Sequence, residues 1–169
     1  MSSTRLPGKV MAEINGFPMI YWQIRRIHEA VQVDKLVLAT TIHHSDDVLS
    51  DFVNQIGVEV FRGSVDDVHS RFRDLIEKNS QFENIVRLTG DCPMTMPKLL
   101  DEMIVAFEHQ NLDYYSNCNP PTFPDGLDIE IFSRQAFIRL SNAALSASEK
   151  EHVTLGFLNR AEDLSLIHI

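Results

Sequence analysis

The sequence predicts an α/β fold in which a largely parallel sheet is covered by helices. Up to residue 112, short apolar runs alternate with segments whose apolar residues recur every three or four positions, and the connections between them are short. This alternation is typical of strands joined by right-handed helical crossovers. At 169 residues, we expect one domain that spans 1–169.

The first two predicted helices enclose a strand. Pro18 suits the first turn of a helix. The apolar stripe of that helix is expected at Ile20, Ile24, Ile27 and Val31. LVLATT, at 36–41, is a continuous apolar run ending in threonines, as expected for a strand covered on both faces. Ser45 predicts the N-cap of the second helix, which is expected to end before Gly57.

The following strands and helices continue the alternation. VEVF, at 58–61, is a short strand, and Ser64 with Asp67 three residues later resembles a capping arrangement for a third helix. IVRLT, at 85–89, is a further strand that runs into the turn GDCP, and Pro97 begins the next helix.

The pattern changes after residue 112. DYYSN is followed by NPPTFPDG, which is too rich in proline for a central strand, so we expect a long functional loop here. DIEIF, at 128–132, alternates polar and apolar residues as a strand does, and helices are expected over 134–144 and 148–160.

Composition excludes several classes of protein. The net charge of -9 argues against a nucleic-acid partner, which would need a positive surface. The apolar runs are too short to span a bilayer, and no signal peptide precedes the first motif, so we expect a cytoplasmic protein without a membrane partner.

The segment TRLPGK is typical of a loop that follows an apolar strand, but the start of the sequence, MSSTRLPGK, contains no such strand. At the other end, LSLIHI ends without a stop signal. We therefore expect truncation at both ends.

Ligands of an open parallel sheet bind beyond the carboxyl ends of its strands, and the segment TRLPGK is expected at this edge. Gly8 allows the backbone to approach a ligand closely, while Arg5 and Lys9 can hold phosphate oxygens. A disordered basic N-terminus without a ligand is the alternative.

Two groups of carboxylates are expected at the same edge. Asp91 directly follows a strand and a glycine, where it could bind Mg²⁺ or cap the following turn. Asp125, Asp128 and Glu130 form the second group. Asp128 and Glu130 share one face of the predicted strand while Ile129 and Ile131 face the core, although a solvated edge strand would show the same pattern.

Asp67 and Arg71 are four residues apart on the third predicted helix. Physical reasoning alone favours a surface ion pair between these two side chains.

The sequence contains no Ser-His-Asp or Cys-His set that stands out as a site of covalent catalysis.

Six segments in order are similar to one family: STRLPGK, NGFPMI, FRGSVDDVHSRF, RLTGDCP, TFPDGLDIEIF and EHVT. They resemble the cytidylyltransferase family of acidic-sugar activation, in particular the branch of the spore coat polysaccharide biosynthesis protein F, and are similar to the acylneuraminate and KDO cytidylyltransferases. The likeness covers roughly residues 2 to 160. It implies a Rossmann-like, three-layer fold related to the nucleotide-diphospho-sugar transferases, here without its first strand.

The resemblance also implies a reaction and its site. CTP is joined to an acidic sugar with release of pyrophosphate, Arg5, Gly8 and Lys9 lie on the triphosphate, and Asp91 holds Mg²⁺. Further residues are implied near the nucleotide, namely Asp67, Arg71, Arg87 and Thr89. Three carboxylates are implied near the sugar or a second cation, namely Asp125, Asp128 and Glu130. Of these, Asp128 is the implied second metal ligand. A homodimer formed near the proline-rich loop is expected.

The chain departs from the family pattern at two points. The strand and the arginine that precede TRLPGK in the family are missing, and Leu155 replaces the proline that usually follows EHVT. The first departure puts catalytic competence in doubt. A catalytically silent nucleotide-binding module is therefore one alternative. A glycosyltransferase of similar fold is the other.

Overall fold

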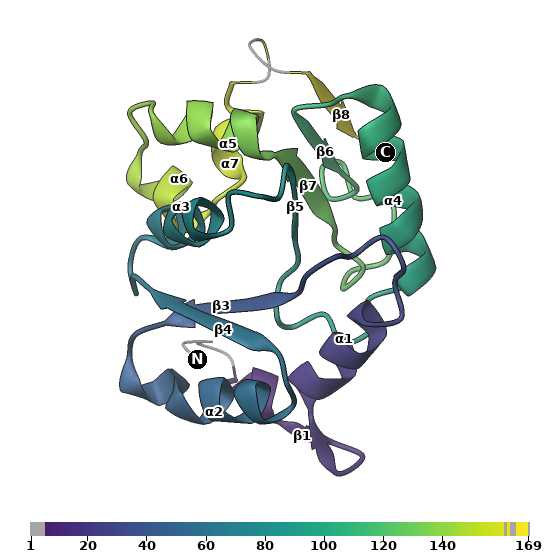
Figure 1. Ribbon diagram of the computed structural model, residues 1–169, viewed down its shortest axis with the longest axis vertical. Coiled ribbons are helices and arrows are strands. Elements are labelled where there is room, and N and C mark those ends of the chain that lie inside the picture. The colour runs from purple at the N-terminus through teal and green to yellow at the C-terminus, as the bar shows by residue number, and fades with distance from the viewer. Residues whose placement is uncertain (1–5, 161, 163–164, 169) are drawn as a thin grey trace.

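The strands form two main sheets in a computed structural model that describes residues 6–160, 162 and 165–168 (Figure 1). In the first sheet, β3 (Val37–Thr41) pairs in parallel with β4 (Glu59–Gly63). The second sheet has the strand order β5-β7-β6-β8. Its strands are β5 (Asn84–Arg87), β6 (Tyr114–Ser116), β7 (Glu130–Ser133) and β8 (Leu166–His168). Together with the helices, these sheets confirm the predicted α/β class.

Helices connect most of these strands. They are α1 (Met19–Ile27), α2 (Asp47–Gln55), α3 (Val68–Lys78), α4 (Pro97–Gln110), α5 (Arg134–Ser141), α6 (Ala147–Glu151) and α7 (Leu155–Leu158). Shorter elements are the 3-10 helices η1 (Lys9–Met11) and η2 (His44–Asp46) and the hairpin of β1 (Glu13–Ile14) with β2 (Phe17–Pro18). Of the helices in the described part of the chain, none has the length and apolar character needed to cross a membrane.

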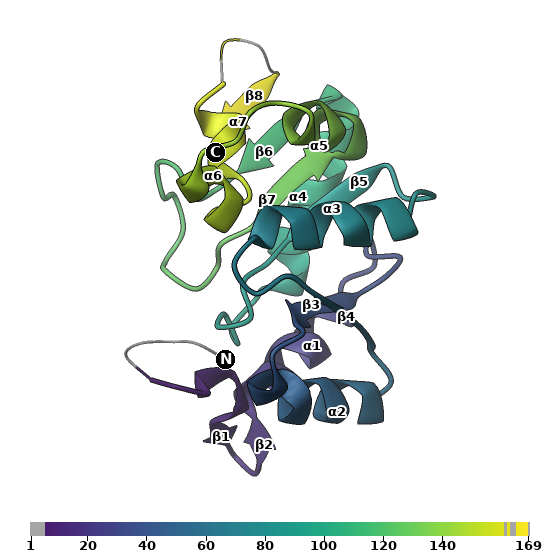
Figure 2. The same cartoon turned by 90° about the vertical axis from the view of Figure 1, so that its left-hand side faces the viewer.

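The four-stranded sheet lies between two layers of helices (Figures 1 and 2). Successive side chains of a strand point to opposite faces, and β7 follows this rule. Ile131 packs in the cluster that contains Leu100 and Met103 of α4. Phe132 packs on the opposite face, in the cluster that contains Phe137 of α5 and Phe157 of α7. Both faces of the sheet are therefore buried.

A third cluster of apolar side chains joins α1 and α2 to the sheet of β3 and β4. Its buried members are Ile20, Ile24, Leu49, Val53 and Val58. Ile27 packs instead in the cluster around α4. The predicted stripe of the first helix is wrong at its last position. Val31 is 81% exposed because α1 ends at Ile27 and Val31 lies beyond it.

The predicted largely parallel direction is confirmed for only part of the strands. β3 pairs in parallel with β4 and β6 with β8, but β7 runs antiparallel to both of its neighbours, β5 and β6. The connection from β6 to β7 contains no helix. A parallel pair needs a crossover, usually a helix, whereas a loop can join antiparallel strands, which explains the reversed direction of β7.

Two features after residue 112 differ from the sequence analysis. No strand was predicted within DYYSN, yet Tyr114–Ser116 form the buried strand β6, which is too short to show a periodic pattern. The helix expected over 148–160 is divided into α6 and α7, because His152 has a non-helical backbone with φ -105° and ψ 86°.

Glu149 ties α6 to α7. Its carboxylate accepts hydrogen bonds from Ser146 N at 2.8 Å and Arg160 Nη1 at 2.5 Å, and its side chain is only 6% exposed. The hydrogen bond from Arg160 is the main reason why the pKa of Glu149 falls from 4.5 to about 2. This contribution to stability is therefore present above pH 4.5 and is lost as the pH falls toward 2.

We expect Glu149→Gln to lower the free energy of unfolding by about 1–3 kcal/mol at pH 7. Urea unfolding at pH 7 and at pH 3 measures the effect, and the difference between variant and wild type should shrink at pH 3. Glu151→Gln, at an exposed position of the same helix, is the matched control and should change stability by less than about 0.5 kcal/mol. A difference that is equal at both pH values would contradict the assigned role.

Candidate functional site

The N-terminal loop turns back on itself at Gly8. Gly8 has φ 70° and ψ 16°, a left-handed conformation that glycine adopts without steric cost. Met11 N donates a hydrogen bond to Gly8 O at 2.8 Å, at the start of η1, whose first residue is Lys9. Arg5, the other predicted phosphate ligand of this loop, lies outside the described residues.

Lys9 and Asp91 form an ion pair between segments that are 82 positions apart in the sequence. Both side chains remain accessible, with 36% and 39% of their surface exposed. The hydrogen bond from Lys9 is the largest cause that lowers the pKa of Asp91. The structure thus brings together a cation and a carboxylate that were predicted to share one edge of the sheet.

Residues of α1 hold the turn that carries Asp91. Gln23 Nε2 donates to Thr89 O at 2.8 Å, and Arg26 Nε donates to Thr95 O at 2.6 Å. The Thr89 hydroxyl lies 3.1 Å from the Cys92 sulfur. Thr89 therefore supports this turn.

Sequence reasoning missed Gln23. This residue is 2% exposed and lies among the apolar positions of α1. A polar residue on an apolar helix face was the available signal, because a buried amide needs hydrogen-bond partners.

The carboxylates before β7 have different surroundings. Asp125 is exposed, whereas Asp128 is half-buried. Burial raises the pKa of Asp128 most, and the neighbouring charges of Asp125, Glu130 and Asp91 raise it further. Because the charge of Asp91 contributes, the turn that carries Asp91 and the segment that carries Asp128 lie within electrostatic range of each other.

Glu130 and Arg87 bind each other. They form an ion pair between the neighbouring strands β7 and β5, and Glu130 also accepts a hydrogen bond from the Tyr114 hydroxyl at 2.8 Å. The strand predicted over 128–132 begins two residues later than expected, because β7 starts at Glu130 and Asp128 lies just before it. Ile129 and Ile131 are buried, as predicted.

Asp67 and Arg71 have separate contacts. Asp67 is the N-cap of α3 and accepts a hydrogen bond from Ser70 N at 2.7 Å. Arg71 Nη1 donates to Ser64 O at 2.7 Å. The prediction of an ion pair between Asp67 and Arg71 is therefore wrong. Asp67 binds the N-terminus of α3, and Arg71 binds a loop carbonyl. A Cβ at Gly63 would lie 2.8 Å from Cγ of Arg71, so glycine leaves room for this arginine.

Arg71 lines a cavity of about 480 Å³ together with the C-terminal end of β3. Its buried Nε has no hydrogen-bond partner among the described residues. Burial lowers the pKa of Arg71, while the charge of Asp46 opposes this change. Arg71 therefore places a partly desolvated guanidinium beside the cavity, and its Nε is buried.

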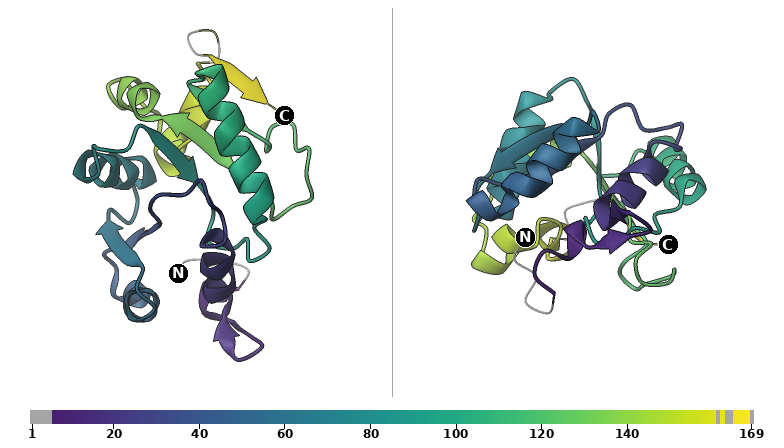
Figure 3. Two further views of the ribbon diagram at one scale, coloured as in Figure 1. Left: turned by 45° about the vertical axis from the view of Figure 1, so that its right-hand side comes forward. Right: turned by 90° about the horizontal axis from the view of Figure 1, so that it is seen from below.

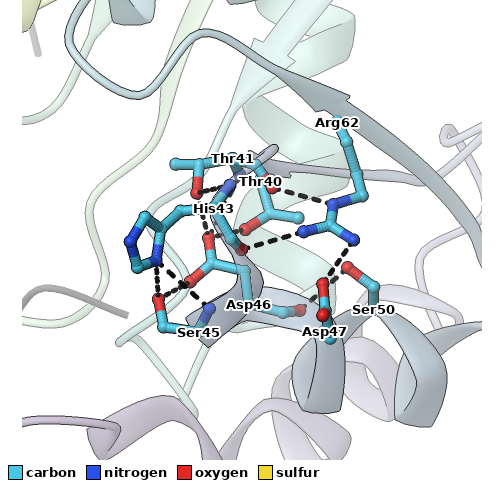
Figure 4. Close-up of polar contacts among 8 residues, drawn as sticks. All are labelled: Thr40, Thr41, His43, Ser45, Asp46, Asp47, Ser50 and Arg62. Atoms are coloured by element: carbon cyan, nitrogen blue, oxygen red, sulfur yellow. Dashed lines mark hydrogen bonds and ion pairs between the residues drawn. The ribbon is translucent and has the colours of Figure 1, made fainter.

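Asp46 also lines this cavity. Figure 4 shows its polar contacts. Asp46 is 1% exposed and accepts hydrogen bonds from the hydroxyls of Thr40 and Thr41, each at 2.7 Å, and from Thr41 N at 3.1 Å. Burial raises the pKa of Asp46, but hydrogen bonds, including those from both threonines, hold it well below its usual range.

Asp46 is also the N-cap residue of α2, so the prediction of Ser45 as the cap is wrong. The Ser45 hydroxyl instead donates to Asp46 at 3.2 Å. Sequence reasoning did not single out Asp46, because adjacent Asp46 and Asp47 look alike in the sequence.

Asp91 and Asp128 are the two carboxylates that could take part in holding a hard cation together with phosphate oxygens. In the described part of the chain, no three His, Cys, Asp or Glu side chains are grouped to hold a metal ion. Mg²⁺ commonly uses one or two carboxylates, with substrate phosphates as further ligands. Asp91 is accessible, and Asp128 is near enough for the charge of Asp91 to raise its pKa.

The chain matches the family described as "Cytidylyltransferase" over residues 1–166. It is 37% identical over 164 residues to the spore coat polysaccharide biosynthesis protein SpsF of Bacillus subtilis, covering 94% of this chain and 67% of that protein. It is 33% identical over 107 residues to a 3-deoxy-manno-octulosonate cytidylyltransferase of Psychrobacter, covering 60% of this chain and 37% of that protein.

A solved structure described as a cytidylyltransferase from Leptospira borgpetersenii is similar over the whole chain. The TM-score is 0.94 at 32% sequence identity, with 100% of this chain and 71% of that one covered. The predicted Rossmann-like nucleotidyltransferase fold is therefore confirmed.

Proposed function

Since this chain belongs to the cytidylyltransferase family, we propose that it joins CTP to an acidic sugar and releases pyrophosphate, for the biosynthesis of a surface polysaccharide such as that of the spore coat. The contact between Lys9 and Asp91 carries the proposal, because it sets a cation beside a carboxylate at an accessible point. The names of the SpsF and octulosonate relatives support both the pathway and the class of sugar.

The reaction is a phosphoryl transfer. A hydroxyl oxygen of the sugar forms a bond to the α-phosphorus of CTP, and the bond from this phosphorus to the oxygen that bridges to the β-phosphate breaks. Pyrophosphate leaves with the electron pair, and the hydroxyl proton passes to solvent. Such a reaction depends mainly on positioning and on neutralising phosphate charge.

The residues have distinct proposed roles. Lys9, with Arg5 and the backbone at Gly8, neutralises and positions the triphosphate. Arg71 and Asp67 contribute to the nucleotide site, in keeping with the position of Arg71 beside the cavity. The further proposed roles are those of Arg87 and Thr89 beside the nucleotide and of Asp125, Asp128 and Glu130 toward the sugar. For Arg87 and Glu130, their mutual ion pair favours an indirect role.

Mg²⁺ is the proposed cofactor, held by Asp91 and Asp128. When bound, it would neutralise negative charge on the phosphate oxygens. A homodimer and a cytoplasmic location are further proposals.

Pyrophosphate release tests this function. CTP, UTP, ATP and GTP are each combined with 3-deoxy-manno-octulosonate, N-acetylneuraminate or a neutral hexose, with and without Mg²⁺. We expect release only with CTP, an acidic sugar and Mg²⁺. Turnover with UTP or GTP would contradict the choice of base, and CTP binding without turnover would indicate a silent nucleotide-binding module. Transfer from a nucleotide-sugar with release of nucleoside diphosphate would indicate a glycosyltransferase.

A further inference from the structure

A buried asparagine lies where the pairing of β6 with β7 ends. Ser116 is the last residue of β6, and it is paired with Glu130, the first residue of β7. Asn117 and Ile129 are the next residues on the two segments, and Asn117 N donates a long hydrogen bond to Ile129 O at 3.4 Å. Asn117 is only 2% exposed, so its side-chain amide needs partners inside the protein.

The amide of Asn117 finds these partners on both sides of Asp128. Its Nδ2 donates to Leu127 O at 2.9 Å, and its Oδ1 accepts from Ile129 N at 2.8 Å. A carboxamide carries a donor and an acceptor at the end of one short side chain, so it can bind a carbonyl and an N–H at the same time. The side chain of Asn117 therefore continues the pairing of the two segments beyond the last backbone pair.

These two hydrogen bonds act on the backbone of Asp128 itself. Leu127 O belongs to the peptide group that ends at the nitrogen of Asp128, and Ile129 N belongs to the peptide group that begins at its carbonyl carbon. Each peptide group is planar, so a residue has only two soft backbone dihedral angles, φ and ψ. Hydrogen bonds to both groups restrict both angles of Asp128, and hence the direction in which its side chain leaves the backbone.

Further contacts hold the loop that precedes Asp128 to the core. Phe123 and Leu127 pack against the apolar cluster that contains residues of α4, and Figure 3 shows the loop beside this helix. Leu127 N donates to Pro124 O at 3.2 Å, which closes a turn with Asp125 in its second position. Asp125 is exposed at this turn, whereas Asp128 is half-buried and lies between the two peptide groups that Asn117 holds.

We infer that Asn117 is a positioning residue for Asp128 and holds its carboxylate at the candidate site. The charge of Asp91 acts on Asp128, so the two carboxylates lie within electrostatic range of each other. This inference rests on the proposed function, in which Asp91 and Asp128 hold Mg²⁺ together with the phosphates of CTP. Replacement of a residue that orients a metal ligand commonly lowers metal affinity or activity by about 10- to 100-fold.

Two variants of Asn117 test the inference. Asn117→Leu removes both hydrogen bonds at a similar side-chain size, and Asn117→Asp keeps an acceptor for Ile129 N but removes the donor to Leu127 O. We expect the Mg²⁺ concentration for half-maximal release of pyrophosphate to rise at least about tenfold in Asn117→Leu and by less in Asn117→Asp, with a smaller change in kcat at saturating Mg²⁺. Calorimetric titration of Mg²⁺ into the chain with CTP should show the same shift. Asn117→Asp decides the inference alone if Asn117→Leu does not fold.

Three controls separate positioning from a general loss of stability. Glu149→Gln is expected to destabilise the protein through the tie between α6 and α7, and it should keep the wild-type dependence on Mg²⁺. Asn54→Asp makes the same chemical change at an exposed position and should behave as wild type. In the Asp128→Asn background, replacement of Asn117 should cause no further shift, because Asn117 acts through Asp128.

The other outcomes overturn the inference. Folded Asn117 variants with the wild-type dependence on Mg²⁺ would do so, as would a shift that adds to that of Asp128→Asn or that Glu149→Gln shares. Wild type that neither releases pyrophosphate nor binds Mg²⁺ with CTP would instead overturn the proposed function. Hydrogen exchange at Ile129 N–H then tests the contact separately. Exchange should be at least about tenfold faster in the folded Asn117 variants, and unchanged exchange would show that Asn117 does not hold this segment.

Discussion

Replacement of Asp91 by asparagine is expected to lower the rate of pyrophosphate release from CTP by about 100- to 1,000-fold. Asparagine keeps the shape of the side chain but removes the negative charge that Lys9 contacts and that a cation would need. Steady-state assays over a range of Mg²⁺ concentrations measure the change. We expect CTP binding measured by calorimetry to lose most of its dependence on Mg²⁺.

Lys9→Met distinguishes the two members of the ion pair. It leaves the carboxylate of Asp91 available but removes a cation from the proposed phosphate site, so CTP affinity should fall also when Mg²⁺ is saturating. Because the two residues are in contact, the double variant is expected to be non-additive. Additive effects would indicate that the residues act independently.

Asp74→Asn is the matched control for Asp91→Asn. Asp74 is on α3, its side chain is 51% exposed, and it pairs with Arg73 at 3.2 Å. The same chemical change at this position should leave turnover within about twofold of wild type, since exposed ion pairs contribute little. Full activity of Asp91→Asn would overturn the role assigned to the carboxylate.

Asp46→Ala is expected to lower the free energy of unfolding by about 2–4 kcal/mol at pH 7. The substitution leaves the hydroxyls of Thr40 and Thr41 and the backbone N–H of Thr41 without their shared acceptor, at a position that is 1% exposed. Urea unfolding followed by circular dichroism measures this loss. Asp47→Ala is the neighbouring control and removes a partly exposed ion pair with Arg62, so it should cost less than about 1 kcal/mol.

The pH dependence of this effect has a defined sign. The pKa of Asp46 is lower in the folded protein than its ordinary value of 3.8. Its contribution is therefore fully present above pH 3.8 and is lost as the pH falls below that value. Wild type and Asp46→Ala should approach each other in stability under acid conditions. A constant difference down to pH 2 would contradict the assignment of a charged Asp46.

Local rules were enough to predict that Lys9 and Asp91 lie close together. A glycine turn and a carboxylate after a strand can be recognised from neighbouring residues, and the prediction of Lys9 near Asp91 needed only the rule that ligands bind beyond the carboxyl ends of strands. Arg87 and Glu130 show the limit of this reasoning. Their pairing depends on β7 lying beside β5, and no spacing in the sequence encodes that neighbour.

By itself, the sequence determined the α/β class, the alternation of apolar strands with amphipathic helices up to residue 112, and the inward side of residues such as Ile129 and Ile131. Only the tertiary structure decided that Tyr114–Ser116 form a strand, that β7 runs antiparallel, and that Asp46 rather than Ser45 is the N-cap of α2. The physical reason is the distance along the sequence over which each effect acts. Periodicity and turn chemistry act between near neighbours, whereas strand pairing and the satisfaction of buried charges depend on residues that only folding brings together.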